Sequence, residues 1–241
     1  MRRFIVYRVA IFAYDFPHHK TNDFIVESKL SGVELAGVIG APRKALPSYG
    51  HFIGYRPLPQ PAPRDTAAIC ASFGLKYVTL DHGDAHAIGE RVRRWGANLA
   101  IIAGARILDA AVIEHFRYGI INFHPGKIPE TSGLDAFYWM LEKGAPAGVT
   151  AHLIDRKVDA GQFLFFEGAM VDSDDTLATI AYKIYVAQLV ALRRVFDTIR
   201  KKEPFESTQI ERPNKNPPMS DAQRAAAVAK FDQWKRRFAS S

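Results

Sequence analysis

Two polar side chains stand at the end of an apolar run near the middle of the chain, in the stretch INFHPGKIPETSG over residues 121–133. The run predicts a buried strand, and ligands of parallel sheets bind at the carboxyl ends of the strands. Because residues i and i+2 of a strand point to the same side, Asn122 and His124 would present an amide donor and an imidazole to one point. The prolines and glycines that follow disfavour a helix and let backbone approach a ligand. The pair by itself is equally compatible with a structural role, in which Asn and His cap the next turn.

A third polar residue adds a carboxylate. Asp159, in RKVDAGQFL, lies in the turn between two predicted strands. A carboxylate beside a histidine favours the imidazolium and fixes the ring orientation. The three groups suit acyl transfer to an amine, because the amide and imidazolium can stabilise an oxyanion while the carboxylate assists proton movement. The sequence contains no Gly-x-Ser-x-Gly elbow, which favours a diffusible acyl donor over a covalent acyl-enzyme.

The elements that would position these residues alternate along the chain, as in an α/β protein with a largely parallel sheet. Apolar runs predict strands at 9–13, 34–39, 76–80, 99–103 and 119–123, with two further strands at 148–155 and 162–170. Helical patterns fall at 20–30, 65–73, 84–95, 109–117 and 175–201. The N-terminus imitates a signal peptide, but Arg8 interrupts its apolar run, so it is interpreted as the first strand.

Two segments depart from this alternation. Residues 41–64 hold six prolines without periodicity, which is typical either of a lid or binding loop or of a segment wrapped on the surface. After residue 202 a Pro-rich stretch leads to one helix, with Ser220 and Gln223 as a capping box and apolar residues at helical spacing. The sequence therefore predicts a catalytic domain over 1–202 and a linker with a C-terminal helix over 203–241. That helix would dock on the body or on a partner subunit, so a homodimer is possible.

Composition and charge narrow the class of protein. The chain of 241 residues is 48% hydrophobic and 24% charged, as globular proteins are. No segment has the ~20 apolar residues of a membrane span, and the single cysteine, Cys70, fits a small buried side chain in a cytoplasmic protein. The net charge of +7 is concentrated in residues 201–241, which carry nine Lys and Arg against five Asp and Glu. Such a tail is more often a solvated surface than a nucleic-acid site, so nucleic acid is an unfavoured partner.

The motifs NFHPGKIPETSG and GVTAHLIDRKVDAG, preceded by IAGARILDAAVI, strongly resemble the folate-dependent formyltransferase family over about residues 98–170. The resemblance implies a Rossmann-like sheet and 10-formyltetrahydrofolate as formyl donor, with no metal. It also implies that Asn122 and His124 polarise the formyl group and that Asp159 tunes the histidine and relays protons. His152 matches a histidine common in the family and would either support the site or be a strand residue with a satisfied hydrogen bond.

The same resemblance implies a pterin pocket lined by Arg106, Ile107 and Leu108, with backbone of Ile154 and Asp155 on the opposite wall.

The chain departs from the family directly after His124. Where many members have His-Pro-Ser-Leu-Leu-Pro or His-Ala-Ser-Leu-Leu-Pro, this chain has Gly-Lys-Ile at 126–128. Any role of that serine hydroxyl is absent here, which affects the acceptor more than the chemistry.

The acceptor expected from the resemblance is an amino sugar. The stretch AYDFPHHKTNDF after the first strand lacks the glycine-rich phosphate loop of glycinamide ribonucleotide formyltransferases. Residues 202–241 are too short for the tRNA-gripping barrel of methionyl-tRNA formyltransferases, and the chain begins at the first strand, without the regulatory domain of formyltetrahydrofolate hydrolases. The compact branch that remains is most like amino-sugar N-formyltransferases, which act on nucleotide-linked amino-deoxy sugars or nonulosonic acids for surface glycans.

Four residues are candidates for binding this acceptor: Tyr14, His18, Lys20 and Lys127. His18 and His19 could equally be solvent-exposed loop residues. His82 and His86 stand at i and i+4, as metal ligands on a helix do, but without further ligands they are interpreted as surface residues. A formyltetrahydrofolate hydrolase and a non-catalytic RNA-binding relative are the alternative functions.

Overall fold

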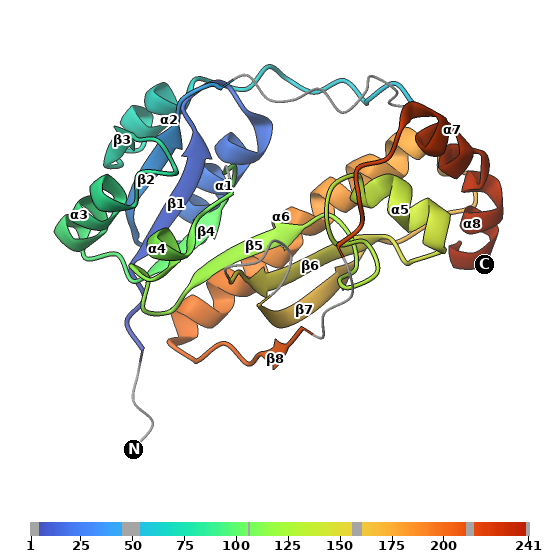
Figure 1. The fold of residues 1–241 in the computed structure, drawn as a ribbon. Helices are drawn as coiled ribbons and strands as arrows, with labels where there is room; N and C mark the ends of the chain where they lie inside the picture. Colours follow the sequence, from blue (N-terminus) through green and yellow to red (C-terminus); the bar gives the residue numbers. More distant parts are fainter. Residues whose placement is uncertain (1–4, 45–53, 106, 156–160, 211–214, 240–241) are drawn as a thin grey trace.

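A computed structural model describes residues 5–44, 54–105, 107–155, 161–210 and 215–239. Its centre is an eight-stranded sheet in the order β3-β2-β1-β4-β5-β6-β7-β8 (Figure 1). The five strands from β3 to β5 are parallel, and β6, β7 and β8 each pair antiparallel to the preceding strand. The strands are β1 Val9–Tyr14, β2 Leu35–Ala41, β3 Tyr77–Thr79, β4 Leu99–Ile102, β5 Ile120–His124, β6 Gly148–Leu153, β7 Gln162–Gly168 and β8 Thr208–Gln209.

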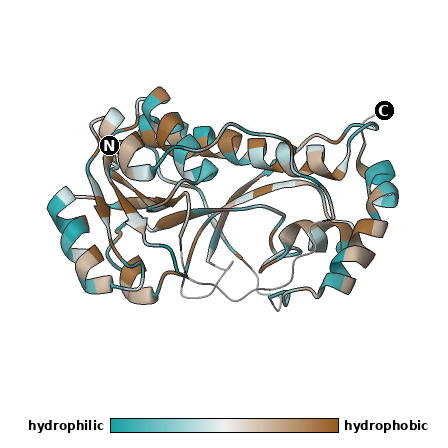
Figure 2. Cartoon of the chain, turned by 90° about the horizontal axis from the view of Figure 1, so that it is seen from above, coloured by the Kyte–Doolittle hydropathy of each residue, from teal (hydrophilic) through white to brown (hydrophobic). Residues whose placement is uncertain are grey.

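Helices pack on both faces of the sheet and form a separate core on each. They are α1 His19–Leu30, α2 Thr66–Ser72, α3 Ala85–Trp95, α4 Ala110–Ile113, α5 Ala136–Lys143, α6 Leu177–Lys201, α7 Asp221–Ala229 and α8 Phe231–Phe238. Strand residues alternate between two cores. Ile11, Ile101 and Phe123 belong to the core that also contains residues of α1 and α6, whereas Phe12 and Ile120 belong to the core beneath α3 and α4. Figure 2 shows hydrophobic residues on the central strands and alternating hydropathy along the helices, as expected for amphipathic elements.

The α/β architecture predicted from the sequence is confirmed, with differences at individual elements. Helix α5 and strand β8 were not predicted, because α5 is short and follows a Pro- and Gly-rich loop, and β8 has two residues. The helix predicted at 109–117 shrinks to α4. The single C-terminal helix predicted from the spacing is wrong: it is two helices that meet at Lys230, and Ala227 of the first and Trp234 of the second are both buried.

The C-terminal helices dock on the body of the same chain. The indole nitrogen of Trp234 donates to the carbonyl oxygen of Ala145 at 2.8 Å, where the indole ring is buried. The guanidinium of Arg224 lies 3.2 Å from the carboxylate of Asp135, just before α5. Of the two docking partners expected from the sequence, the structure therefore shows the body. The division into 1–202 and 203–241 stays a prediction.

The hydropathy of the helices and the burial of Cys70 can be compared with the sequence predictions. Within the described ranges, no helix combines the length and the apolar character needed to cross a bilayer. Cys70 is fully buried, as predicted, and burial, with a smaller contribution from Asp65, raises the pKa of its thiol to about 12. The thiol is therefore unreactive at neutral pH.

Candidate active site

Asn122 and His124 lie at the carboxyl end of β5 and point to the same side of the sheet. The intervening Phe123 packs in the core with Phe24 of α1, at 5.5 Å between ring centroids, so the two polar side chains face the opposite way. In Figure 1, α6 covers one face of β5–β7, and the other face is crossed by loops. The juxtaposition predicted from the i, i+2 spacing is thus present, on a face that no described helix seals.

The orientation of the Asn122 amide is set by the neighbouring strand. Asn122 is directly opposite His152 in the antiparallel β5–β6 register, and its Nδ2 atom lies 3.2 Å from His152 Nε2. An amide nitrogen can only donate, so His152 Nε2 is the acceptor in this assignment. His152 is completely buried. Both roles expected for His152 are therefore combined, since it has a satisfied hydrogen bond and that bond supports Asn122.

The orientation of the His124 imidazole is fixed by the loop that follows β5. Its Nε2 atom lies 2.9 Å from the carbonyl oxygen of Thr131 and 3.3 Å from Thr131 Oγ1. The Thr131 hydroxyl in turn donates to the carbonyl oxygen of Lys127 at 3.0 Å, so its oxygen can only accept at the histidine. Both neighbours of Nε2 are acceptors, which places the ring hydrogen on Nε2. Thr131 was missed by sequence reasoning, because nothing in the residue type signals this contact.

The departure Gly-Lys-Ile at 126–128 has a steric reason. A Cβ atom built on Gly126 would stand 2.1 Å from Thr131 Oγ1, so any side chain at this position requires the buried threonine to move. The loop is also tied to β6, since Thr150 Oγ1 donates to the carbonyl oxygen of Gly126 at 2.7 Å and accepts from the Ile128 amide at 3.0 Å. The Ile128–Pro129 peptide bond is cis. Gly126 and Thr131 thus form one packed unit beside His124.

Two predicted site residues, Asp159 and Arg106, lie outside the described residues. Of the others expected at the pterin pocket, Ile107 is 73% exposed, whereas Leu108 is buried in the core beneath α3 and α4. The amide of Ile154 already donates to the carbonyl oxygen of Ile120 at 2.9 Å, which extends the β5–β6 pairing. Asp155 follows directly and is half-buried.

Tyr14 and His18, two of the predicted acceptor residues, lie in a cluster of aromatic rings at the end of β1. Tyr14 donates its hydroxyl to the carbonyl oxygen of Ala105 at 3.1 Å and stacks on Phe16 at 4.9 Å between centroids. The guanidinium of Arg43 lies 4.5 Å from the centre of the Phe16 ring, a cation–π distance. The His18 ring meets Tyr14 edge-on at 5.0 Å. Phe16 and Arg43 were missed, because Arg43 comes from the end of another strand, β2.

His18 and Lys20 have different charge states at neutral pH. Burial lowers the pKa of His18 to about 4, with further lowering by Lys20 and His19. The ring is therefore neutral at pH 7, and His18 Nδ1 accepts from the amide of Thr21 as the N-cap of α1. Burial lowers the pKa of Lys20 to about 8, and its ammonium lies 5.1 Å from the centre of the Phe24 ring. Lys20 is thus the cation of this pair, and the interpretation of His18 as a solvated loop residue is wrong.

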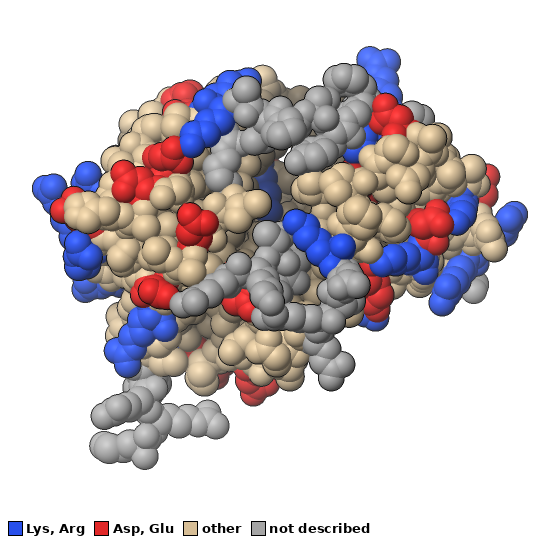
Figure 3. All heavy atoms as spheres, viewed as in Figure 1, with Lys and Arg blue, Asp and Glu red and all other residues tan. Residues whose placement is uncertain are grey.

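Lys127, the fourth predicted acceptor residue, lies on the loop after His124 and pairs with Glu130 at 3.4 Å, with both side chains well exposed. The face seen in Figure 3 is hollowed near its centre, with basic groups beside the hollow and acidic groups interspersed around it.

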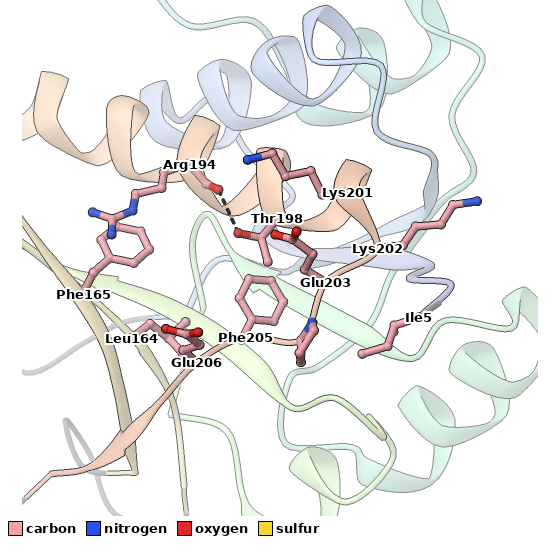
Figure 4. Close-up of a pocket in the computed structure, with 11 residues that line it drawn as sticks. Ile5, Leu164, Phe165, Arg194, Thr198, Lys201, Lys202, Glu203, Phe205 and Glu206 are labelled. Atoms are coloured by element: carbon pink, nitrogen blue, oxygen red, sulfur yellow. Dashed lines mark hydrogen bonds between the residues drawn. The ribbon is translucent and has the colours of Figure 1, made fainter. Parts of the chain in front are cut away.

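Neither of two described hollows contains Asn122 or His124. One, of about 740 Å³, is lined by the end of α6 and the segment after it, including Arg194, Thr198 and Phe205 (Figure 4). In Figure 4 the Arg194 guanidinium lies over the Phe165 ring, at 4.0 Å from its centre. The other, of about 410 Å³, lies between α1, α6 and residues 58–63 and includes His19. His124 is buried, with 4% of the residue exposed, and Asn122 is half-buried.

The described residues contain no group of three or more His, Cys, Asp or Glu that could hold a metal ion. The prediction that both His82 and His86 lie on the surface is wrong for His82. His82 precedes α3 rather than lying on it, is fully buried, and makes a 3.2 Å hydrogen bond with the carbonyl oxygen of Ile39. Its ring meets Phe12 edge-on at 5.0 Å. His86 is exposed on α3.

Known proteins resemble this chain in sequence and in fold. Methionyl-tRNA formyltransferase of Lachnospira eligens is 26% identical over 165 residues, which cover 65% of this chain and 52% of that protein, so the chain spans about half the length of this relative. A phosphoribosylglycinamide formyltransferase from Anaplasma phagocytophilum has a similar fold, with a TM-score of 0.63 and 19% identity over 87% of this chain and 97% of that one. A sugar N-formyltransferase from Shewanella sp. FDAARGOS_354 also has a similar fold, with a TM-score of 0.58 and 16% identity over 87% of this chain and 75% of that one. The family model described as formyl transferase matches residues 71–195, more than half of the 241. The chain belongs to the formyl transferase family.

Proposed function

We propose that this protein transfers a formyl group from 10-formyltetrahydrofolate to the amine of an amino sugar, of the nucleotide-linked amino-deoxy or nonulosonic acid type, for glycan synthesis. The observation that carries the proposal is that Asn122 and His124 point to the same side of the sheet, each held by a separate hydrogen-bonding partner. An oriented amide donor such as Asn122 stabilises the negative charge that develops on an acyl oxygen during attack by an amine, and His124 lies beside it.

The residues of this chain fit the folate. The exposed Ile107 offers an apolar surface at the end of β4, and the strand end carrying Asn122 lies beside it in the sheet. Arg106, Ile107, Leu108, Ile154 and Asp155 would hold the pterin, largely through backbone. When bound, the folate supplies the formyl group.

The roles of the chain's side chains follow from their chemistry. Asn122 has a second amide hydrogen beyond the one directed at His152, and it can donate this hydrogen to the formyl oxygen. His124 has its Nε2–H held by Thr131, which fixes the orientation of the ring beside Asn122. Asp159 would receive the proton from the attacking amine through His124 or water.

The acceptor follows from the ends of β1 and β2. Tyr14 and Phe16 supply flat apolar faces, Arg43 and Lys20 supply positive charge, and Lys127 lies on the loop next to His124. A sugar linked to a nucleotide has a base that stacks on aromatic rings and phosphates that pair with cations. A fold shared with a sugar N-formyltransferase supports this choice.

The test is formyl transfer by the purified protein. Incubation with 10-formyltetrahydrofolate and a panel of dTDP-, UDP-, GDP- and CMP-linked amino sugars should give a formylated sugar by mass spectrometry and equal release of tetrahydrofolate. Asn122→Ala, His124→Ala and Asp159→Ala should abolish turnover. Asn98→Ala is the matched control, because Asn98 bonds backbone at the opposite end of the sheet, to Val6 and Arg8.

The same assay separates the alternatives. Tetrahydrofolate release without any amine would identify a hydrolase, and formylation of glycinamide ribonucleotide or methionyl-tRNA would move the acceptor to that of the relatives found by sequence. Salt-sensitive retention of RNA without turnover would favour the non-catalytic relative. Failure to formylate any amino sugar would overturn the proposal.

A further inference from the structure

Asn216 lies outside the region of family resemblance, between β8 and α7, yet its side chain enters the loop beside His124. Only 6% of the residue is exposed. Its Nδ2 atom donates to the carbonyl oxygens of Glu130 and Ser132, both at 2.9 Å. Its Oδ1 atom accepts from Lys143 Nζ at 2.5 Å, which fixes the orientation of the amide. Both amide hydrogens of this side chain are therefore used on one short segment, residues 130–132, and the amide oxygen is used on α5.

The two carbonyl oxygens that Asn216 holds stand on either side of Thr131. The main chain adds a second tie, because the Asn216 amide donates to the carbonyl oxygen of Ser132 at 3.1 Å. The peptide unit between them carries the Thr131 carbonyl, which accepts from His124 Nε2. A carbonyl between two fixed neighbours cannot rotate freely, so its direction is set by the residues that hold those neighbours.

We propose that Asn216 is a positioning residue for His124. By fixing the peptide planes around Thr131, its amide keeps the Thr131 carbonyl directed at Nε2, which holds a ring hydrogen on Nε2 and fixes the orientation of the imidazole. The C-terminal segment is thereby a part of the active-site architecture. The proposal rests on the proposed function only in that His124 is taken to act on the formyl group.

A purely structural role would be attachment of the C-terminal segment, but that attachment has other bonds. Trp139 Nε1 donates to the carbonyl oxygen of Pro217 at 3.1 Å, and the amide of Met219 donates to Asp135 at 2.8 Å. Arg224 pairs with the same carboxylate. Removal of the Asn216 amide hydrogens should therefore leave the segment docked while releasing the peptide planes around Thr131.

The test is Asn216→Asp, which keeps the shape of the side chain and removes both donated hydrogens. The matched control is Asn98→Asp, the same change at an asparagine that donates to the carbonyl oxygen of Val6 far from the carboxyl ends of the strands. The readouts are the ¹⁵N shifts of the His124 ring, which distinguish the Nε2–H from the Nδ1–H tautomer, and kcat and KM for formyl transfer.

We expect wild type and Asn98→Asp to show the Nε2–H tautomer at His124. In Asn216→Asp this signature should be lost or mixed, and kcat should fall about 10- to 100-fold with little change in KM, since misplacement of a catalytic group acts mainly on the transition state. If Asn216→Asp does not fold, Lys143→Gln leaves the amide in place without its orienting partner and should shift the same signals less. The proposal would be overturned by unchanged His124 signals in a folded Asn216→Asp protein. If that variant does not fold, unchanged His124 signals in Lys143→Gln would overturn it. An Nδ1–H tautomer in wild type would also overturn it.

The NMR readout does not depend on turnover. A protein that lacks formyl transfer but shows the tautomer change would contradict the proposed function and leave the positioning role intact. A protein that is active and shows no change at His124 would contradict the positioning role alone.

Discussion

The amide nitrogen of Asn122 lies 3.2 Å from the Nε2 atom of His152, on the residue directly opposite it in the antiparallel pair β5–β6. Because His152 is fully buried, water does not compete for its Nε2 atom. The Asn122 amide is therefore held with one hydrogen directed at His152. The second hydrogen and the amide oxygen of Asn122 then also have fixed directions. Such preorganised donors do not have to reorient during reaction.

Substitution of His152 by phenylalanine should lower kcat without a large change in KM. The aromatic ring fills the buried volume but gives Asn122 no acceptor, so the amide can rotate, and we expect a loss of about ten-fold or more. His152→Gln, whose Oε1 atom can accept, should recover part of the rate. A wild-type kcat in His152→Phe, or no recovery of rate in His152→Gln relative to His152→Phe, would contradict this relationship.

Substitution of Gly126 by alanine should disturb both stability and catalysis. The new Cβ would stand 2.1 Å from Thr131 Oγ1, in a buried site, and we expect a loss of about 2 kcal/mol in the free energy of unfolding. Thr131→Ala removes the clashing oxygen, so the double variant should lose less than the sum of the two single variants. Urea unfolding of the four proteins gives the comparison, and additive losses would show that the clash is relieved elsewhere.

The affinity for an anionic acceptor should fall as the pH rises through about 8. Burial lowers the pKa of Lys20 to about 8, so the side chain is cationic below this pH and loses its charge above it. The KM for a nucleotide-linked sugar should rise across this range in wild type. Lys20→Arg, which stays cationic, should remove the rise, and Lys20→Met should have a high KM at every pH. A wild-type KM that stays constant from pH 7 to 9 would exclude Lys20 from acceptor binding.

The stability of the protein should decrease between pH 6.5 and pH 4 through His18. Burial, followed by Lys20 and His19, lowers the pKa of the folded-state imidazole to about 4 from its usual 6.5. The unfolded chain therefore binds more protons in this window, so the contribution of His18 is complete above pH 6.5 and is lost as the pH falls toward 4. His18→Asn keeps an N-cap acceptor that does not titrate, and its free energy of unfolding should fall less over the same range. Equal pH dependence in the two proteins would contradict this assignment.

Parts of the fold that depend on local pattern were predictable. The apolar runs gave the position of β5, and the period of two along a strand put Asn122 and His124 on one side, because side-chain direction in a strand is fixed by the backbone itself. The buried state of Cys70 followed from its apolar helical surroundings. His82 was misjudged, because a histidine three residues before a helix has no local signal for burial, and its partners come from strands β1 and β2.

What the sequence alone determined is which polar residues are candidates for the site and the alternation of strands and helices that brings Asn122 and His124 to the edge of a sheet. Only the tertiary structure decided how those groups are held. His152 reaches Asn122 through the register of a strand 30 positions away, and Asn216 reaches the loop beside His124 from a segment 84 residues beyond Ser132. Register and docking depend on which surfaces pack together over the whole molecule. The free energy of that packing is summed over many distant contacts, so no local stretch of residues records it.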